Sequence, residues 1–138
     1  MKKLFVYFWA SPATLLGLVF VPFAIISRGR VRAVCGVIEV HGGLVTLFLR
    51  RGILVSGGIA AMTLGHVVLG LDQLSLDCSR AHERVHVAQY ERWGPLMIPL
   101  YLLFSALARM RGADPYLDNR FEVEAHALET RESRLGLT

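Results

Sequence analysis

The chain opens with a long, predominantly apolar run between two groups of basic residues. Lys2 and Lys3 precede the run, which extends from Leu4 to Ile26. About 20 apolar residues suffice to cross a bilayer, and this run is longer. A cleaved signal sequence is the alternative, but arginines follow directly and no small-x-small cleavage site ends the run. The pattern favours an uncleaved membrane anchor over residues 1–32, followed by a compact domain over residues 33–138.

Two apolar segments punctuated by glycine follow. In "VIEVHG" apolar and polar residues partly alternate, and the pair Gly42 and Gly43 is typical of a turn between strands. Residues 53–71 are apolar enough for a second membrane span, whereas their glycines, β-branched residues and short length favour a buried strand. Both interpretations remain open. We expect His41 and His66, within these segments, to be hydrogen-bonded structural histidines.

The stretch "CSRAHERVHVAQYERWGP" gathers polar residues on one side of a predicted helix. His82 and His86 lie one turn apart, about 40° from each other at 100° per residue. Glu83 falls at the shoulder of this face, whereas Arg84 and Glu91 suit the solvent side. Two imidazoles one turn apart can bind one tetrahedral metal ion, and a neighbouring carboxylate can take a proton from its water. The order H-E-x-x-H is the signature of zinc peptidases.

Four further side chains lie near this helix face. Gln89 and Trp93 extend it, either beside a substrate or packed against a neighbouring helix. Tyr90 lies on the Glu83 side, where its hydroxyl can donate to a developing oxyanion. We expect Cys78, a turn before the motif, to be an inert buried thiol and not a metal ligand.

A catalytic zinc site of this kind needs a third protein ligand and one open position. The last predicted helix, "RFEVEAHALETRES", has Asn119 as its cap and offers Glu122, Glu124 and Glu129. Glu122 and Glu124 lie about 200° apart on the helix, so only one of them can face the metal. Amphipathicity does not decide between them, because both flank the apolar stripe of Phe121.

The pair "HERVH" and "FEVEAHA" resembles the gluzincin metallopeptidases. In these, a glutamate opening E-x-x-x-D or E-x-x-x-A on a second helix completes the H-E-x-x-H site. The nearest likeness is to minimal gluzincins, membrane-bound CAAX-prenyl and heat-shock type peptidases, and small bacterial membrane proteins. The resemblance covers residues 63–129. It implies that His82, His86 and Glu122 bind one zinc ion and that Glu83 is the general base.

The resemblance implies a membrane-anchored zinc-dependent metallopeptidase that hydrolyses peptide bonds. His126 stands where the membrane families carry an aspartate, on the Glu122 face, and is a candidate to orient that carboxylate. A strand over residues 59–69 would pair with an extended substrate. The alternative is a membrane protein that binds zinc or a peptide without catalysis, because no substrate-covering subdomain or specificity pocket is visible in this short chain.

Composition restricts the class of protein further. The chain has 138 residues, of which 54% are hydrophobic, and a mean hydropathy of +0.47. These values favour one membrane-associated domain over an ordinary soluble one. The net charge of +4 comes without a lysine or arginine run, so we expect no nucleic-acid partner. Cys35 and Cys78 have no framework spacing and fit reduced thiols.

Together these patterns predict an α+β fold. Its expected parts are an N-terminal membrane anchor helix, a small glycine-punctuated β-sheet, a zincin-like active-site helix and a C-terminal ligand helix. The expected partners are a peptide or protein substrate and membrane lipid, with the single anchor in a bacterial inner membrane. The segment from Leu96 to Ala108 should not cross, because His86 and Glu122 on either side of it must meet at one ion. The substrate, the side of the membrane and the oligomeric state are not assigned.

Overall fold

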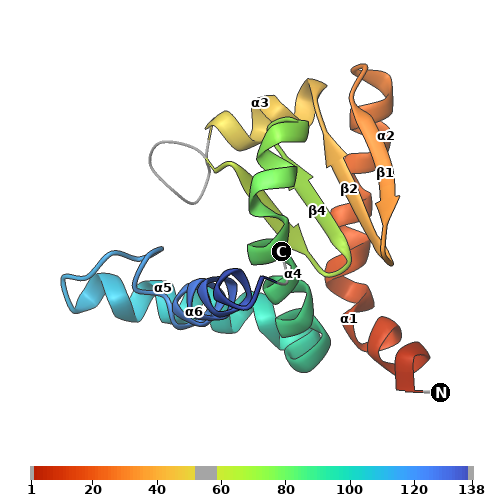
Figure 1. The fold of residues 1–138 in the computed structure, drawn as a ribbon. Coiled ribbons are helices and arrows are strands. Elements are labelled where there is room, and N and C mark those ends of the chain that lie inside the picture. Colours follow the sequence, from red (N-terminus) through yellow and green to blue (C-terminus); the bar gives the residue numbers. More distant parts are fainter. Residues whose placement is uncertain (1, 52–58, 137–138) are drawn as a thin grey trace.

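A computed structural model of the chain describes residues 2–51 and 59–136. Within them it has the expected α+β architecture, with a long apolar N-terminal helical segment, a four-stranded mixed sheet, a long central helix and a C-terminal helix (Figure 1). The elements in chain order are α1 (Lys2–Leu18), α2 (Phe20–Ile26), β1 (Arg30–Val34), β2 (Val37–His41), α3 (Gly43–Arg51), β3 (Ala61–Leu64), β4 (Val67–Gly70), α4 (Gln73–Trp93), the 3₁₀ turn η1 (Gly94–Leu96), α5 (Met97–Met110) and α6 (Arg120–Arg134).

The sheet has the strand order β1-β2-β4-β3. β1 and β2 form one antiparallel hairpin and β3 and β4 another, and the two hairpins join through the parallel pair β2 and β4. The hairpins turn at Gly36 and Gly65, whose φ angles of 80° and 62° favour glycine. β3 is consequently an edge strand of the sheet.

The strand interpretation of residues 53–71 is confirmed for the part that is described, and residues 52–58 lie outside the described residues. The single strand predicted over 59–69 is instead the β3–β4 hairpin, because Gly65 reverses the chain. Both of its strands are paired, which satisfies their backbone groups within the sheet.

The turn between strands predicted at Gly42 and Gly43 was wrong, because Gly43 begins the helix α3. Val45 and Leu49, four residues apart, are the buried side chains of this helix. That spacing has the helical period of 3.6 and not the strand period of 2. The Ser27 hydroxyl accepts a hydrogen bond from the Leu44 amide at 2.9 Å, which satisfies one free donor of the first turn.

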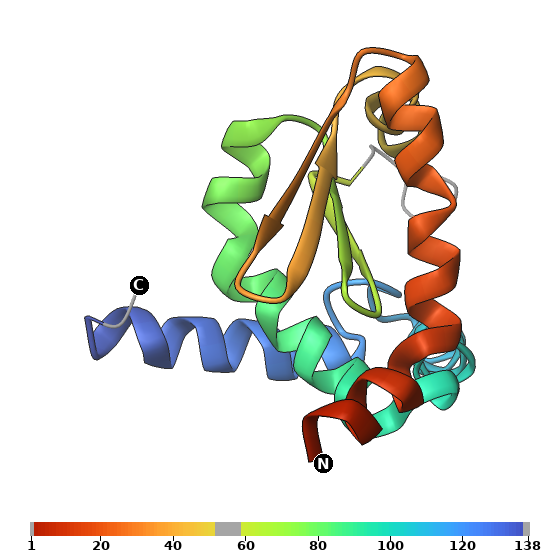
Figure 2. The ribbon, with the colours of Figure 1, turned by 90° about the vertical axis from the view of Figure 1, so that its right-hand side faces the viewer.

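The sheet lies between two helical layers, with α1 and α2 on one face and α4 on the other (Figure 2). Successive residues of β4 alternate between these layers, as the pleat requires. Val67 and Leu69 pack with Ala24 of α2, whereas Val68 packs with Leu76 of α4. The domain therefore has two core clusters, one on each face of the sheet. The helix α4 packs on the second face, against β3 and β4.

Two helical stretches of the described chain are long and apolar enough to cross a membrane, Leu4–Ile26 and Gln73–Met110. The first fits either a membrane anchor or a signal sequence. It breaks after Leu18, because Pro22 has no N–H to donate to the Leu18 carbonyl. The second consists of α4 and α5, which are separated by η1 at Gly94.

Candidate metal centre

The helix α4 carries the H-E-x-x-H motif and has defined ends. At its start the Asp72 side chain accepts a hydrogen bond from the Ser75 amide at 2.7 Å, and at its end Gly94 adopts a φ of 52°. The face toward α6 and β3 is buried, and it includes His82, Glu83 and His86 at 6–7% exposure. Polar groups buried to this extent require partners.

The helix α6 is fixed at its start by Asn119, which is fully buried. Its Oδ1 atom accepts a hydrogen bond from the Phe121 amide at 3.0 Å, so the predicted helix cap is confirmed. Its Nδ2 atom donates to the Tyr101 carbonyl at 2.9 Å and to the Ser105 hydroxyl at 2.8 Å. One residue thus joins α6 to α5 and sets the position of Glu122 in the first turn of α6.

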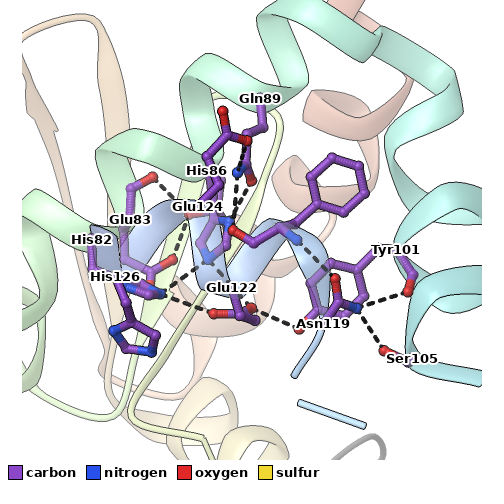
Figure 3. A network of polar contacts seen from close by, with 12 residues as sticks. His82, Glu83, His86, Gln89, Tyr101, Ser105, Asn119, Glu122, Glu124 and His126 are labelled. Atoms are coloured by element: carbon purple, nitrogen blue, oxygen red, sulfur yellow. Dashed lines mark hydrogen bonds and ion pairs between the residues drawn. The ribbon is translucent and has the colours of Figure 1, made fainter. Parts of the chain in front are cut away.

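Three side chains converge where α4 meets α6 (Figure 3). The Nε2 atom of His82 lies 3.1 Å from that of His86 and 3.1 Å from Glu122 Oε2. His86 Nε2 lies 3.4 Å from Glu122 Oε1. In a tetrahedral site with bonds of ~2.0–2.1 Å, neighbouring ligand atoms are about 3.3 Å apart. The three side chains therefore have the donor atoms and the spacing to hold a metal ion.

The geometry separates the three candidate carboxylates on α6. Glu122 is the one that contacts both motif histidines. Glu124 instead accepts hydrogen bonds from Gln89 at 2.9 Å and Arg92 at 3.3 Å. Glu129 lies 3.3 Å from the other nitrogen of His82, Nδ1, although the alignment falls short of a hydrogen bond.

The orientation of His86 follows from that of Gln89. The Nε2 atom of Gln89 donates to the Phe121 carbonyl at 3.0 Å and to Glu124 Oε2 at 2.9 Å, which fixes the direction of the amide. Its Oε1 atom must then accept a hydrogen bond from His86 Nδ1, 2.8 Å away. His86 Nε2 is left without a proton in the neutral ring, as a metal ligand requires.

The carboxylate of Glu122 is held in its charged form. Burial alone would raise its pKa, but the neighbouring imidazoles of His82 and His86 outweigh burial and lower the pKa well below the ordinary value. Tyr101 also donates its hydroxyl hydrogen to Glu122 Oε1 at 2.7 Å. Burial would lower the pKa of both histidines, but Glu122 raises it in each. The cluster thus favours the positively charged forms of His82 and His86 beside the carboxylate of Glu122.

Glu83 lies beside this cluster but points to a different partner. Its Oε2 atom accepts a hydrogen bond from the Thr63 hydroxyl on β3 at 2.6 Å. Glu83 is 6% exposed, and burial raises the pKa of its carboxyl. A raised pKa brings a carboxylate closer to the range in which it exchanges protons near neutral pH.

A cavity of about 200 Å³ opens beside the cluster. Its polar wall includes Glu83, His86 and Glu122, together with the hydroxyl-bearing side chain of Tyr90. Its remaining walls are mostly apolar, and most of their residues come from β3 and α5, among them Ala61, Met62, Leu64, Ile98 and Leu102. The cavity therefore joins the buried histidines and carboxylates to an edge strand and an apolar surface.

The expectation that His126 orients Glu122 was wrong. The His126 ring packs against His82 with ring centres 4.6 Å apart, and its Nδ1 atom lies 3.6 Å from Glu129. His126 therefore contacts His82 and Glu129 in place of Glu122. A second group, His82, His126 and Glu129, also brings three possible ligand atoms together, but it is partly exposed and shares His82.

The remaining predicted residues divide between structural roles and surface positions. His66 is hydrogen-bonded as expected, with Glu91 at 3.1 Å, whereas the Nε2 atom of His41 is buried and unpaired among the described residues. Trp93 packs edge-on against the Phe121 ring. Cys78 is exposed, so the expectation of a buried thiol was wrong.

Sequence reasoning missed two residues that hold the site in place. Thr63 orients Glu83 from a strand 20 residues away, and no local pattern indicates that contact. Tyr101 binds Glu122 from within an apolar helix. Tyr101 and Ser105, four residues apart, are polar interruptions on one face of that helix, and this spacing was the available signal.

Comparisons with protein-family models, with curated proteins and with solved structures gave no significant match. The class of protein consequently follows from the fold and the site. The chain is an α+β protein with a long apolar N-terminal helix and a buried group of two histidines and one glutamate that can hold a metal ion.

Proposed function

We propose that the chain is a membrane-anchored zinc-dependent metallopeptidase. Its ligands are His82, His86 and Glu122, and its general base is Glu83. The proposal depends on one observation above all. Glu83 is buried outside the three-ligand group, yet it faces the same cavity as His86 and Glu122. A structural metal site has no use for a further buried carboxylate, which is costly to keep.

Zinc is the ion that suits this donor set best. Two imidazole nitrogens and one carboxylate oxygen form the ligand set of many catalytic zinc sites, and the ion needs a fourth, open position. When bound, zinc supplies Lewis acidity, which lowers the pKa of a coordinated water and polarises a carbonyl group. The cavity beside His86 and Glu122 provides room for that position.

Glu83 carries out both proton transfers of the proposed reaction. Glu83 takes a proton from the attacking water as the oxygen of that water forms a bond to the peptide carbonyl carbon. Glu83 then gives that proton to the amide nitrogen as the carbon–nitrogen bond breaks. Thr63 holds the carboxylate in place through its 2.6 Å hydrogen bond. Tyr90, on the wall of the same cavity, donates a hydrogen bond from its hydroxyl to the developing oxyanion.

The substrate is an extended peptide with an apolar side chain near the cleaved bond. β3 is an edge strand that lines the cavity, and among the described residues its outer backbone groups have no backbone partner, so they can pair with such a peptide. The apolar walls formed by β3 and α5 suit one large aliphatic or aromatic side chain.

The substitution Glu83→Gln tests the proposal. Glutamine keeps the shape of the side chain and can still accept from Thr63, but it cannot take a proton. Cleavage of fluorescein-labelled casein and of a mixed peptide library by the zinc-loaded chain should fall by at least 100-fold, while bound zinc stays near one per chain. Asp77→Asn, on the exposed side of the same helix, is the control and should retain full activity.

Two outcomes contradict the peptidase proposal. One is equal cleavage by Glu83→Gln and the parent chain. The other is a parent chain that binds zinc and cleaves neither substrate, as expected of a non-catalytic zinc-binding or peptide-binding protein.

A further inference from the structure

The N-terminal helices α1 and α2 have two apolar faces. The inner face consists of small residues. Gly17 and Ala24 lie on the sheet, whereas Ala10 and Ala13 pack against Tyr90, Met97 and Phe121. A Cβ atom at Gly17 would approach Val67 Cβ to 2.6 Å, so this contact permits no larger side chain. The outer face consists of exposed large side chains at helical spacing: Leu4, Phe8, Leu15, Val19, Phe23 and Ile26.

The sheet accompanies the later part of the helical segment, and the first turns of α1 lie beyond the sheet, beside the end of α4 and η1 (Figure 2). Near the start of the segment, the Tyr7 hydroxyl donates to the Gly36 carbonyl in the β1–β2 turn at 3.2 Å. Near its end, the Ser27 hydroxyl accepts from the Leu44 amide at the start of α3. The apolar helices are thus an outer layer of the folded domain and do not project from it.

A crossing of the bilayer by this segment would therefore carry the sheet into the hydrocarbon. β1 is an edge strand with exposed Arg30 and Arg32, and its outer backbone groups are unpaired among the described residues. Lipid-exposed open sheet edges do not occur in the bilayer core, and arginine there is costly. Length alone allows a crossing, but the packing of the segment opposes it.

We propose that the chain binds one leaflet of an anionic bilayer, with α1 and α2 lying lengthwise in the interface. Their outer face enters the boundary between headgroups and acyl chains, as amphipathic interfacial helices do. α5 lies on the same side of the molecule, on the right in Figure 2, and its exposed apolar residues include Leu103 and Met110. The embedding does not rest on the peptidase proposal.

The charge of this region identifies the lipid. The charged residues among the first 38 are all basic: Lys2, Lys3, Arg28, Arg30 and Arg32. They flank both ends of the apolar segment, where a helix lying in the interface places them at headgroup level of a single leaflet. Each basic residue near an anionic surface strengthens binding, so an anionic headgroup is the matching class, and phosphatidylglycerol is the probe used below.

Labelling of single cysteines distinguishes embedding from crossing. Lys3→Cys and Arg30→Cys are made separately in a chain with Cys35→Ser and Cys78→Ser, and each is bound to preformed vesicles of phosphatidylethanolamine and phosphatidylglycerol. A membrane-impermeant maleimide added outside should label both positions fully before detergent is added. Protection of either position until detergent is added would overturn the proposal, as would a chain that does not float with the vesicles.

A second measurement tests the face and the charge. Phe8→Ser with Ile26→Ser should weaken vesicle binding roughly tenfold or more, whereas Leu74→Ser, an exposed apolar residue of α4, should leave it unchanged. Arg30→Gln with Arg32→Gln should weaken binding to anionic vesicles roughly tenfold. Equal loss in the Leu74 control, or equal binding to purely phosphatidylcholine vesicles, contradicts the assigned face and lipid. Glu83→Gln should bind vesicles like the parent, so failure of the peptidase proposal is seen separately.

Discussion

Two clusters in this chain place a buried histidine against a glutamate, and they differ in where the histidine nitrogens point. His66, 4% exposed in the β3–β4 turn, has Nδ1 at 3.4 Å from the Thr14 hydroxyl and Nε2 at 3.1 Å from Glu91. Tyr7 stacks on its ring at 4.2 Å. Its two nitrogens thus contact partners on different helices, α1 and α4. Such a histidine ties elements of the fold together.

At the other cluster, His82 and His86 both direct Nε2 toward Glu122, and Gln89 binds the Nδ1 atom of His86. Burial and a neighbouring carboxylate are common to both clusters. Convergence of three donor atoms occurs only around His82 in the described chain, because both groups with that property include it. Shared direction of the donor atoms, more than burial, therefore distinguishes the candidate metal centre from the structural histidine.

The largest predicted effect comes from removing a motif histidine. His86→Ala should lower zinc affinity by more than about 100-fold, because it removes one of three protein ligands, and a direct ligand matters more than its outer partners. Competition with a chromophoric zinc chelator measures the affinity. His66→Ala is the matched control, and its zinc affinity should equal that of the parent chain. Similar losses in both variants would mean that the two clusters do not differ as described.

The next effect separates the carboxylates of α6. Glu122→Ala should lose roughly 100-fold in zinc affinity, whereas Glu124→Ala should retain the metal, because Glu124 faces Gln89 and Arg92. Zinc content after gel filtration, determined by mass spectrometry, reports the difference. The reverse result would assign the third ligand to Glu124.

A smaller effect is expected from the residue that orients His86. Gln89→Leu removes the acceptor for Nδ1 but leaves every ligand in place, so zinc affinity should fall roughly 10-fold. The same chelator titration measures it, and Leu74→Ser on the exposed side of α4 is the control. An unchanged affinity would show that Gln89 only packs between the helices.

The smallest effect concerns stability, and it tests whether His66 has a structural role that is independent of the metal. His66→Ala should lower the free energy of unfolding by about 1–3 kcal/mol, since it leaves the partners of His66 without their contacts. Zinc at 100 times its Kd should still stabilise this variant by about 2.7 kcal/mol, as it does the parent. Thermal unfolding with zinc and with EDTA provides both values. If zinc no longer stabilised the His66→Ala chain, His66 would be shown to take part in metal binding.

The parts of the site within one helix could be predicted from the sequence. The helical period alone places His82 and His86 one turn apart, and the Asn119 cap follows from residue preference at helix starts. The choice of Glu122 over Glu124 depended on resemblance, because both flank the apolar stripe. The contacts that distinguish Glu122 from Glu124 are made with residues of other helices.

Contacts between distant segments could not be predicted. Thr63 reaches Glu83 because β3 packs against α4, and the packing of two elements is not encoded in the period of either one. In the same way, the length of the apolar run indicated a membrane span but not that its inner face lies on a sheet. The small residues Gly17 and Ala24 carried that information in the sequence.

The most direct test of the metal centre is anomalous diffraction at the zinc absorption edge from crystals of the zinc-loaded chain. We expect one strong peak about 2.0–2.1 Å from the Nε2 atoms of His82 and His86 and from an oxygen of Glu122. A map without a peak at that point, or with its main peak between His126 and Glu129, would contradict the account.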